Sequence, residues 1–504
     1  MTEQRGRTRR PQGTDPRQRR RTGGRGDRRA RPDQTVRMAP VQVGDELELT
    51  VDRLGYRGEG VARHEGFAVF IEGALPGERV QARVTQVARS FAHAHLHTVL
   101  TPATERVVPL CAVYDLCGGC QLQHLSYAGQ LQFKRQAVVD ALTRIGKFPS
   151  QAVEALVRST IPMDEPWRYR NKVQVAAAVR GGRFVIGFVE EGTHEPVEAS
   201  ECLIRPVGHD QVLAKTLEVI DHYAIGAYDE ASGQGDVTRI AIRTTKGGEV
   251  LLIVDTAGAS LPHAKAFASA LAAKVDGIEE EEASDARGLG RPRIRLAGIV
   301  HQPSSGASRV LYGVPYVDET IAGLDFRVSA DSFLQVNPVQ TERLYQEAIQ
   351  AAVLETEDFV WDLYCGIGTL SLLAAQHCRR VVGIEEVEQA VDDAKANATR
   401  NGLPHADFVA GRVEQAIVDL LEREGPPDVV LLDPPRAGCA PEVLAALLVA
   451  SPRRIVYVSC NPATLARDLR LLADGGYESR LIQPLDMFPQ TAHVECCVSL
   501  VRSS

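Results

Sequence analysis

Short apolar segments alternate with helix-like segments in the last third of the chain, and this alternation constrains the fold more than any other feature. The apolar segments are 358–365, 380–386, 407–411, 428–435 and 454–460. Helix-like stretches such as 387–402 and 441–450 lie between them. Such alternation predicts a parallel, doubly wound α/β sheet, because each helix returns the chain to the start of the next strand. Residues 477–502 add two further strand-like stretches at the end.

Three predicted strands end in residues that suit a nucleotide-like ligand. Gly366 and Gly368 follow the first strand and let the backbone approach a ligand closely. Glu385 ends the second strand, where a carboxylate can accept hydrogen bonds from two ribose hydroxyls. Asp433 begins the sequence DPPR after the fourth strand, and its prolines give a rigid loop. Together these features predict S-adenosylmethionine binding, and the late hairpin resembles the layout of class I methyltransferases.

Cys460 stands at the carboxyl end of the fifth predicted strand, in the sequence VSCNP. Most lone cysteines are small buried hydrophobic residues. Ligands gather at this edge of a doubly wound sheet, however, so a thiolate here would lie beside the predicted cofactor. Its addition to carbon 6 of a pyrimidine would make carbon 5 nucleophilic enough to accept a methyl group. A base must then take the proton from carbon 5, and Glu495 in AHVECC is the candidate.

The N-terminal part of the chain predicts RNA binding in two ways. Residues 1–37 contain thirteen arginines and four acidic residues, whereas the whole chain has a net charge of −8. An arginine-rich, low-complexity tail is typical of disorder and attracts phosphate groups. Residues 39–101 show the two-residue alternation of a small, OB-like β-barrel. Through GYRGEGVAR and FIEGALPGERV this stretch resembles a TRAM domain, which implies RNA as its ligand.

Four cysteines form a candidate metal site outside the predicted sheet. Cys111, Cys117 and Cys120 are close in sequence, and Cys202 follows much later. Four thiolates are typical ligands of zinc or of an iron–sulfur cluster, and the spacing leaves both possibilities open. The flanking region 102–330 is predicted to be an α+β middle domain, with 277–293 as an exposed loop. A helix is expected at about 128–147, and residues 165–330 are expected to hold one helix, near 207–224.

The chain as a whole resembles the RNA 5-methyluridine (uracil-5) methyltransferases. The resemblance lies in DSFLQVNP (331–338), DLYCGIGTLSL (362–372), DPPRAG (433–438), YVSCNPATLARDL (457–469) and HVE (493–495). It implies that Cys460 is the nucleophile and Glu495 the base. It also implies that four side chains contact the cofactor, namely Gln335, Tyr364, Glu385 and Asp433.

The same resemblance implies a substrate and a second cofactor. The ribosomal-RNA branch of the family carries a 4Fe–4S cluster on cysteines of this spacing, which here are Cys111, Cys117, Cys120 and Cys202. The presence of both barrel and cluster favours 23S ribosomal RNA, although archaeal relatives with these features can act on transfer RNA. The alternatives are therefore a transfer-RNA uracil-5 methyltransferase and a non-catalytic iron–sulfur protein that binds RNA. A cytosine-5 enzyme would use the same thiolate chemistry. An exocyclic-amine methyltransferase would need no nucleophile, and Arg436 after DPP speaks against it.

The expected organisation is thus a tail (1–38), a barrel (39–101), a middle domain (102–330) and a methyltransferase domain (331–504). The sequence has no run of 18 apolar residues and no secretory signal, so we expect a cytoplasmic protein without a membrane span. We further expect a monomer.

Overall fold

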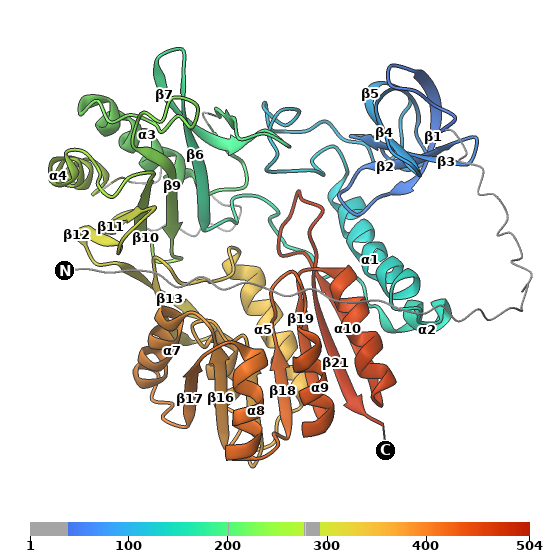
Figure 1. Cartoon of the computed structure of the whole chain (residues 1–504), viewed down its shortest axis with the longest axis vertical. Helices are drawn as coiled ribbons and strands as arrows, with labels where there is room; N and C mark the ends of the chain where they lie inside the picture. The colour runs from blue at the N-terminus through green and yellow to red at the C-terminus, as the bar shows by residue number, and fades with distance from the viewer. Residues whose placement is uncertain (1–38, 200, 277, 279–292, 504) are drawn as a thin grey trace, which may run out of the picture.

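The computed structural model describes residues 39–199, 201–276, 278 and 293–503. The predicted tail (1–38) and nearly all of the predicted loop 277–293 lie outside the described residues. Figure 1 shows a small barrel, a middle sheet and a C-terminal sheet flanked by helices. Within the described ranges, no helix is both long and apolar enough to cross a membrane.

The N-terminal part is a closed barrel with the strand order β1-β2-β3-β5-β4, as the sequence predicts. Its strands are Glu46–Leu54, Gly60–His64, Phe67–Glu72, Arg79–Val87 and Phe91–Thr101. Strands β3 and β5 pair in parallel and the other neighbours pair antiparallel. Alternate residues of β1 and β4 point into the barrel, which explains their two-residue hydrophobic period.

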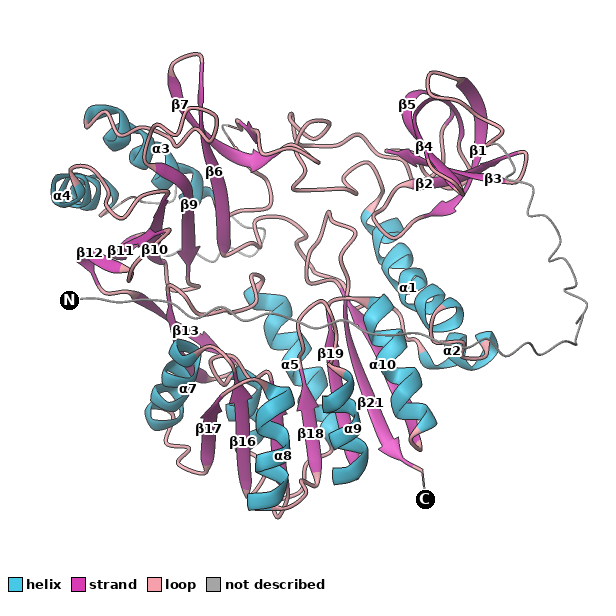
Figure 2. Cartoon of the chain, in the orientation of Figure 1, coloured by secondary structure: helices cyan, strands magenta, loops and turns pink. Residues whose placement is uncertain are grey.

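The middle part is a seven-stranded sheet with the order β12-β11-β10-β9-β6-β7-β8. Its strands are Lys172–Arg180 (β6), Arg183–Val189 (β7), Pro196–Val197 (β8), Val237–Thr244 (β9), Glu249–Thr256 (β10), Arg295–Pro303 (β11) and Arg309–Gly313 (β12). Two helices cover it, α3 (Val207–His222) and α4 (Ala264–Val275) (Figure 2). The prediction of a single helix here is wrong. Phe267, Leu271 and Val275 of α4 are buried at four-residue spacing, a helical signal that the alanine-rich composition of this segment obscured.

The C-terminal part is a seven-stranded sheet with the order β17-β16-β15-β18-β19-β21-β20. Its strands are Phe359–Leu363 (β15), Arg380–Glu385 (β16), Ala406–Ala410 (β17), Val429–Leu432 (β18), Arg454–Ser459 (β19), Tyr477–Leu485 (β20) and Glu495–Arg502 (β21). Its helices are Pro338–Ala352 (α5), Thr369–Ala375 (α6), Glu388–Arg400 (α7), Val413–Glu424 (α8), Pro441–Ala450 (α9) and Pro462–Asp474 (α10). Strand β21 is antiparallel to both neighbours, and the other pairs are parallel. The predicted doubly wound sheet with a late hairpin is therefore confirmed.

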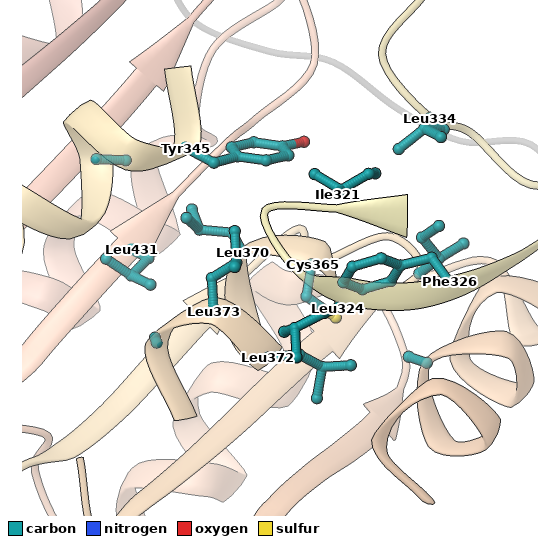
Figure 3. Close-up of a cluster of buried hydrophobic side chains, with 14 of the residues drawn as sticks. Ile321, Leu324, Phe326, Leu334, Tyr345, Cys365, Leu370, Leu372, Leu373 and Leu431 are labelled. Atoms are coloured by element: carbon teal, nitrogen blue, oxygen red, sulfur yellow. The ribbon is translucent and has the colours of Figure 1, made fainter. Parts of the chain in front are cut away.

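Helices cover both faces of this sheet, and neighbouring strand residues pack into different cores. Val360 of β15 belongs to the core under α5, α6 and α7, whereas Trp361 belongs to the core under α8, α9 and α10. Residues buried on both faces produce the continuous apolar runs seen in the sequence. Figure 3 shows part of the first core, in which Leu324 and Phe326 lie beside Leu372.

Two segments outside the sequence range 331–504 also pack against the C-terminal sheet. The hairpin β13 (Tyr316–Ile321) and β14 (Leu324–Ser329) supplies Phe326 to the first core. Helices α1 (Tyr127–Arg144) and α2 (Ser150–Leu156) pack on the second core beside α10 and β20. We therefore propose that the middle domain, bounded at 102 and 330, shares its core with the methyltransferase domain at both ends.

Candidate active site

The candidate site lies at the edge of the C-terminal sheet where the parallel strands end. Because β15, β16, β18 and β19 run in parallel, the residues that follow them meet at this edge. Tyr364, Asp433 and Cys460 directly follow β15, β18 and β19, and Glu385 is the last residue of β16. The antiparallel strand β21 begins with Glu495 at the same edge, because Ser459 pairs with Cys496.

The loop after β15 has the backbone conformation expected of a ligand cradle. Gly366 and Gly368 have φ angles of +54° and +80°. A Cβ atom on Gly368 would lie 2.8 Å from the ring of Phe408, so no larger residue fits there. Tyr364 also has a positive φ of 68°, an unusual conformation for a tyrosine that is often found at functional sites.

Glu385 holds this loop through hydrogen bonds from two backbone N–H groups. One carboxylate oxygen accepts a hydrogen bond from the backbone N–H of Gly366 at 3.1 Å. The other accepts one from Val387 at 3.0 Å. Each oxygen keeps a further lone pair, so Glu385 can still accept hydrogen bonds from two ribose hydroxyls.

Gln335 and Tyr364 occupy different surroundings. Gln335 is buried in the segment that leads into α5. The hydroxyl of Tyr364 lies beside the thiol of Cys439, and burial raises the pKa of this phenol. The backbone of Tyr364, rather than its hydroxyl, therefore faces the glycine loop.

Carboxyl groups without an ion-pair partner surround the centre of the site. Asp362 and Glu495 are buried, and each has one oxygen without a hydrogen-bond partner. Burial raises the pKa of Asp362 and of Asp433 to about 7. Burial, and then the charge of Asp433, raise the pKa of Glu495 well above its usual value. Among the described residues no cation pairs with these groups, so the site suits a ligand that carries positive charge, such as the sulfonium of S-adenosylmethionine.

Cys460 is half-buried beside these acids. The pKa of its thiol is raised to about 11, mainly by burial and also by Glu495 and Asp433, while Arg436 lowers it. Cys460, Glu495 and Asp433 are therefore close enough to influence one another. The structure brings together the nucleophile and the base that the sequence predicts, and their catalytic roles remain a proposal.

Asn461 and Arg436 belong to the same site, although the sequence analysis gave them no role in it. The side-chain N–H of Asn461 donates a 2.9 Å hydrogen bond to the carbonyl of Arg436, which joins the SCNP and DPPR loops. Its side-chain oxygen caps α10 by accepting from Ala463 at 3.0 Å. Arg436 approaches His493, with 3.5 Å between their nitrogens. The sequence could have indicated both residues, because they fall inside the motifs that carry Cys460 and Asp433.

The four cysteines of the candidate metal site line one cavity of about 430 Å³ between the segment 111–123 and the middle sheet. The thiols of Cys202, Cys117 and Cys111 are near enough to Cys120 to raise its pKa, which burial already raises. In the parts of the chain that the structure describes, however, no group of three or more Cys, His, Asp or Glu side chains is arranged to hold a metal ion. In the described part of the chain, the four thiols therefore line one cavity, but they are not arranged as a set of metal ligands.

The fold and the strand-end site together define a class I S-adenosylmethionine-dependent methyltransferase. The family model of the tRNA (uracil-5-)-methyltransferases matches residues 304–503, and that of the TRAM domain matches residues 40–97. An uncharacterized RNA methyltransferase of Halalkalibacterium halodurans is 40% identical over 458 residues, which cover 91% of this chain and 97% of the relative. Another from Clostridium acetobutylicum is 37% identical and covers 92% and 99%.

Among solved structures, the tRNA (uracil-54, C5)-methyltransferase of Pyrococcus abyssi, in complex with S-adenosyl-L-homocysteine, is similar over 90% of this chain and 99% of that one. The TM-score is 0.69 and the sequence identity 26%. The chain thus belongs to the RNA uracil-5-methyltransferase family and carries a TRAM domain. It is an RNA methyltransferase.

Proposed function

We propose that the enzyme methylates carbon 5 of a uridine in RNA through a covalent bond between Cys460 and carbon 6. The observation that carries this proposal is the placement of Cys460, Glu495 and Asp433 around one site at the strand ends. Gln335, Glu385, Asp433 and the loop of Tyr364 and Gly366 would hold S-adenosylmethionine. When bound, that cofactor supplies an electrophilic methyl group.

The chain's own residues would act in a fixed order. The target base must leave its stack to reach the half-buried thiol. The Cys460 thiolate adds to carbon 6, and the electron pair of the 5,6 double bond moves toward the carbonyl at carbon 4. Carbon 5 would then bond to the methyl group while the bond between that group and the cofactor sulfur breaks, which would leave a neutral thioether. Glu495 accepts the proton from carbon 5, the double bond re-forms, and the sulfur–carbon bond breaks. The raised pKa of Glu495 makes it a stronger base than a solvated carboxylate.

Substitution of the two residues separates the steps. Cys460→Ala should abolish methyl transfer and leave S-adenosylmethionine affinity largely unchanged, because the thiol is not expected to hold the cofactor. Glu495→Gln should allow addition and methylation but not release, so a protein–RNA adduct should survive a denaturing gel. Cys378→Ala, at a cysteine outside the site, is the matched control. Turnover by Cys460→Ala would contradict the covalent mechanism, and the lack of an adduct with Glu495→Gln would point to another base.

We propose 23S ribosomal RNA as the substrate, supported by the combination of a TRAM barrel with four cysteines. Transfer RNA is the second candidate, and a specific observation favours it. The similar Pyrococcus abyssi structure is described as a tRNA (uracil-54, C5)-methyltransferase. The two substrates share the chemistry above, so a comparison of RNAs distinguishes them. A monomer in the cytoplasm stays a prediction.

We also propose that Cys111, Cys117, Cys120 and Cys202 hold a 4Fe–4S cluster, because four thiols that line one cavity match the all-thiolate ligand set of such clusters. Anaerobic reconstitution with iron and sulfide should give about four irons per chain and broad visible absorption, by analogy with four-cysteine cluster sites. Cys117→Ser should lose both signals, whereas Cys378→Ser should keep them. Binding of zinc with no visible absorption would contradict the cluster.

A further inference from the structure

A loop of the N-terminal barrel reaches the candidate active site. The hydroxyl of Tyr56, between β1 and β2, donates a 3.0 Å hydrogen bond to the side-chain oxygen of Asn461. Asn461 directly follows Cys460 in the chain. A side chain from the RNA-binding barrel therefore lies beside the nucleophile, although 405 residues separate it from its partner.

This loop is held in one conformation. The backbone N–H of Gly55 donates to the carbonyl of Glu59 at 2.7 Å, and that of Arg57 donates to the Glu59 carboxylate at 2.8 Å. Gly58 has a φ of +88°, and a Cβ atom there would lie 2.8 Å from Leu122 and 3.6 Å from Ala492. The loop thus packs against the segment that leads to Glu495, so the position of Tyr56 is fixed relative to the site.

The ring of Tyr56 remains open to solvent although its hydroxyl is anchored. The residue is 53% exposed, so its aromatic face is accessible to a ligand. Arg436, also exposed, lies close enough to affect the phenol, as does Cys460. An anchored aromatic face beside an arginine matches what single-stranded RNA needs, namely a surface for a base and a cation for its phosphates.

We propose that the ring of Tyr56 stacks on a base of the substrate RNA next to the uridine that enters the site. This inference rests on the proposed function and adds an RNA-contacting residue to it. The hydrogen bond to Asn461 would orient the ring, while Arg436 would attract the adjacent phosphate. The barrel would then help to place the target uridine in addition to binding RNA at a distance.

Two substitutions at the same position separate the ring from its hydroxyl. Tyr56→Ala removes the stacking face, whereas Tyr56→Phe keeps it and removes the hydrogen bond to Asn461. Tyr312→Ala, at another exposed tyrosine on the edge strand β12, is the matched control. The full-length proteins would be compared by KM and kcat with unmodified 23S ribosomal RNA and transfer RNA. The Kd for a fluorescein-labelled 12-nucleotide oligouridylate would be measured without methyl transfer.

Tyr56→Ala should raise the RNA KM and the oligouridylate Kd roughly tenfold, the effect of losing one stacked base. Tyr56→Phe should raise them much less, and the S-adenosylmethionine Kd should not change with either variant. Equal values for Tyr56→Ala and Tyr312→Ala would overturn the inference. Equal losses for Tyr56→Ala and Tyr56→Phe, seen in kcat, would also overturn it and assign the hydroxyl a positioning role. If the wild-type enzyme transferred no methyl group to carbon 5, the proposed function would be wrong. The effect of Tyr56→Ala on the oligouridylate Kd would then still show whether the ring stacks on a base.

Discussion

At the scale of single residues, the pKa of the Cys460 thiol does not match the role proposed for this residue. In the proposed mechanism Cys460 must react as a thiolate, yet the pKa of its thiol is raised to about 11, mainly by burial and also by two neighbouring acids. The free protein at neutral pH therefore holds the thiol protonated. Arg436 is the nearby charged side chain that lowers this pKa. Storing the cysteine as a thiol protects it from oxidation until substrate is bound.

The rate at which Cys460 is alkylated should depend on these opposing effects on the pKa of its thiol. Alkylation by iodoacetamide requires the thiolate, so its rate should increase with pH up to about 11, above the range of an ordinary cysteine. Arg436→Gln removes the favourable charge, raises the pKa further and should slow alkylation at a given pH. Arg470→Gln, an arginine on the outer part of α10, is the control. Mass spectrometry of the Cys460 peptide separates this thiol from the other nine cysteines. A midpoint near 8.5 would contradict this account.

At the scale of elements, helix α1 holds the loop between β20 and β21, which leads to Glu495. Lys134 of α1 and Asp486 of the loop form a fully buried ion pair. Lys134 also donates to the carbonyl of Phe488 at 2.9 Å, and Tyr127 donates to Asp486 at 2.8 Å. Farther along the same loop, the carbonyl of Gln490 accepts hydrogen bonds of 3.0 Å from the backbone N–H groups of Gln121 and Leu122, which precede α1. The segment that bears the cysteines is thereby joined to the segment that bears the candidate base.

Removal of one charged side chain from the Lys134–Asp486 pair should lower the stability of the folded protein strongly. Lys134→Met leaves Asp486 buried without its cation, which should destabilise the protein by about 3–5 kcal/mol. Adding Asp486→Asn should recover part of that loss, because the uncompensated charge disappears. Lys274→Met breaks a solvent-exposed pair with Glu218 and should change the stability far less, because water already solvates both charges. Urea denaturation of the four proteins gives the comparison. Equal destabilisation by Lys134→Met and Lys274→Met would show that the buried pair does not hold the loop.

The contacts between elements mark the limit of what the sequence predicts. The central strands β15, β18 and β19 of the C-terminal sheet were predictable because they are buried on both faces and read as short apolar runs. Cys460 and Glu495 were predictable because short motifs carry them. The contact of Tyr56 with Asn461 joins residues 405 positions apart, and neither local periodicity nor a motif contains that pairing. The position of α1 on the second core is unpredictable for the same reason, because it depends on packing between distant segments.

At the scale of the whole molecule, the barrel, the cysteine cavity and the methyltransferase sheet meet around one site. The barrel contributes Tyr56, and the cysteine segment contacts the loop that leads to Glu495. RNA that binds across the barrel would therefore be directed toward Cys460. Under the proposed function, these contacts beyond the catalytic pocket would help to position the RNA.

The most direct test is methyl transfer from labelled S-adenosylmethionine to unmodified 23S ribosomal RNA and, in parallel, to transfer RNA. Mass spectrometry of the digested RNA would then identify the modified nucleoside and its position. We predict 5-methyluridine at a defined position of the ribosomal RNA. The same nucleoside in transfer RNA alone would keep the mechanism and contradict the proposed substrate. A methyl group on an exocyclic amine, or on cytosine, would contradict the central claim that Cys460 and Glu495 methylate carbon 5 of uridine.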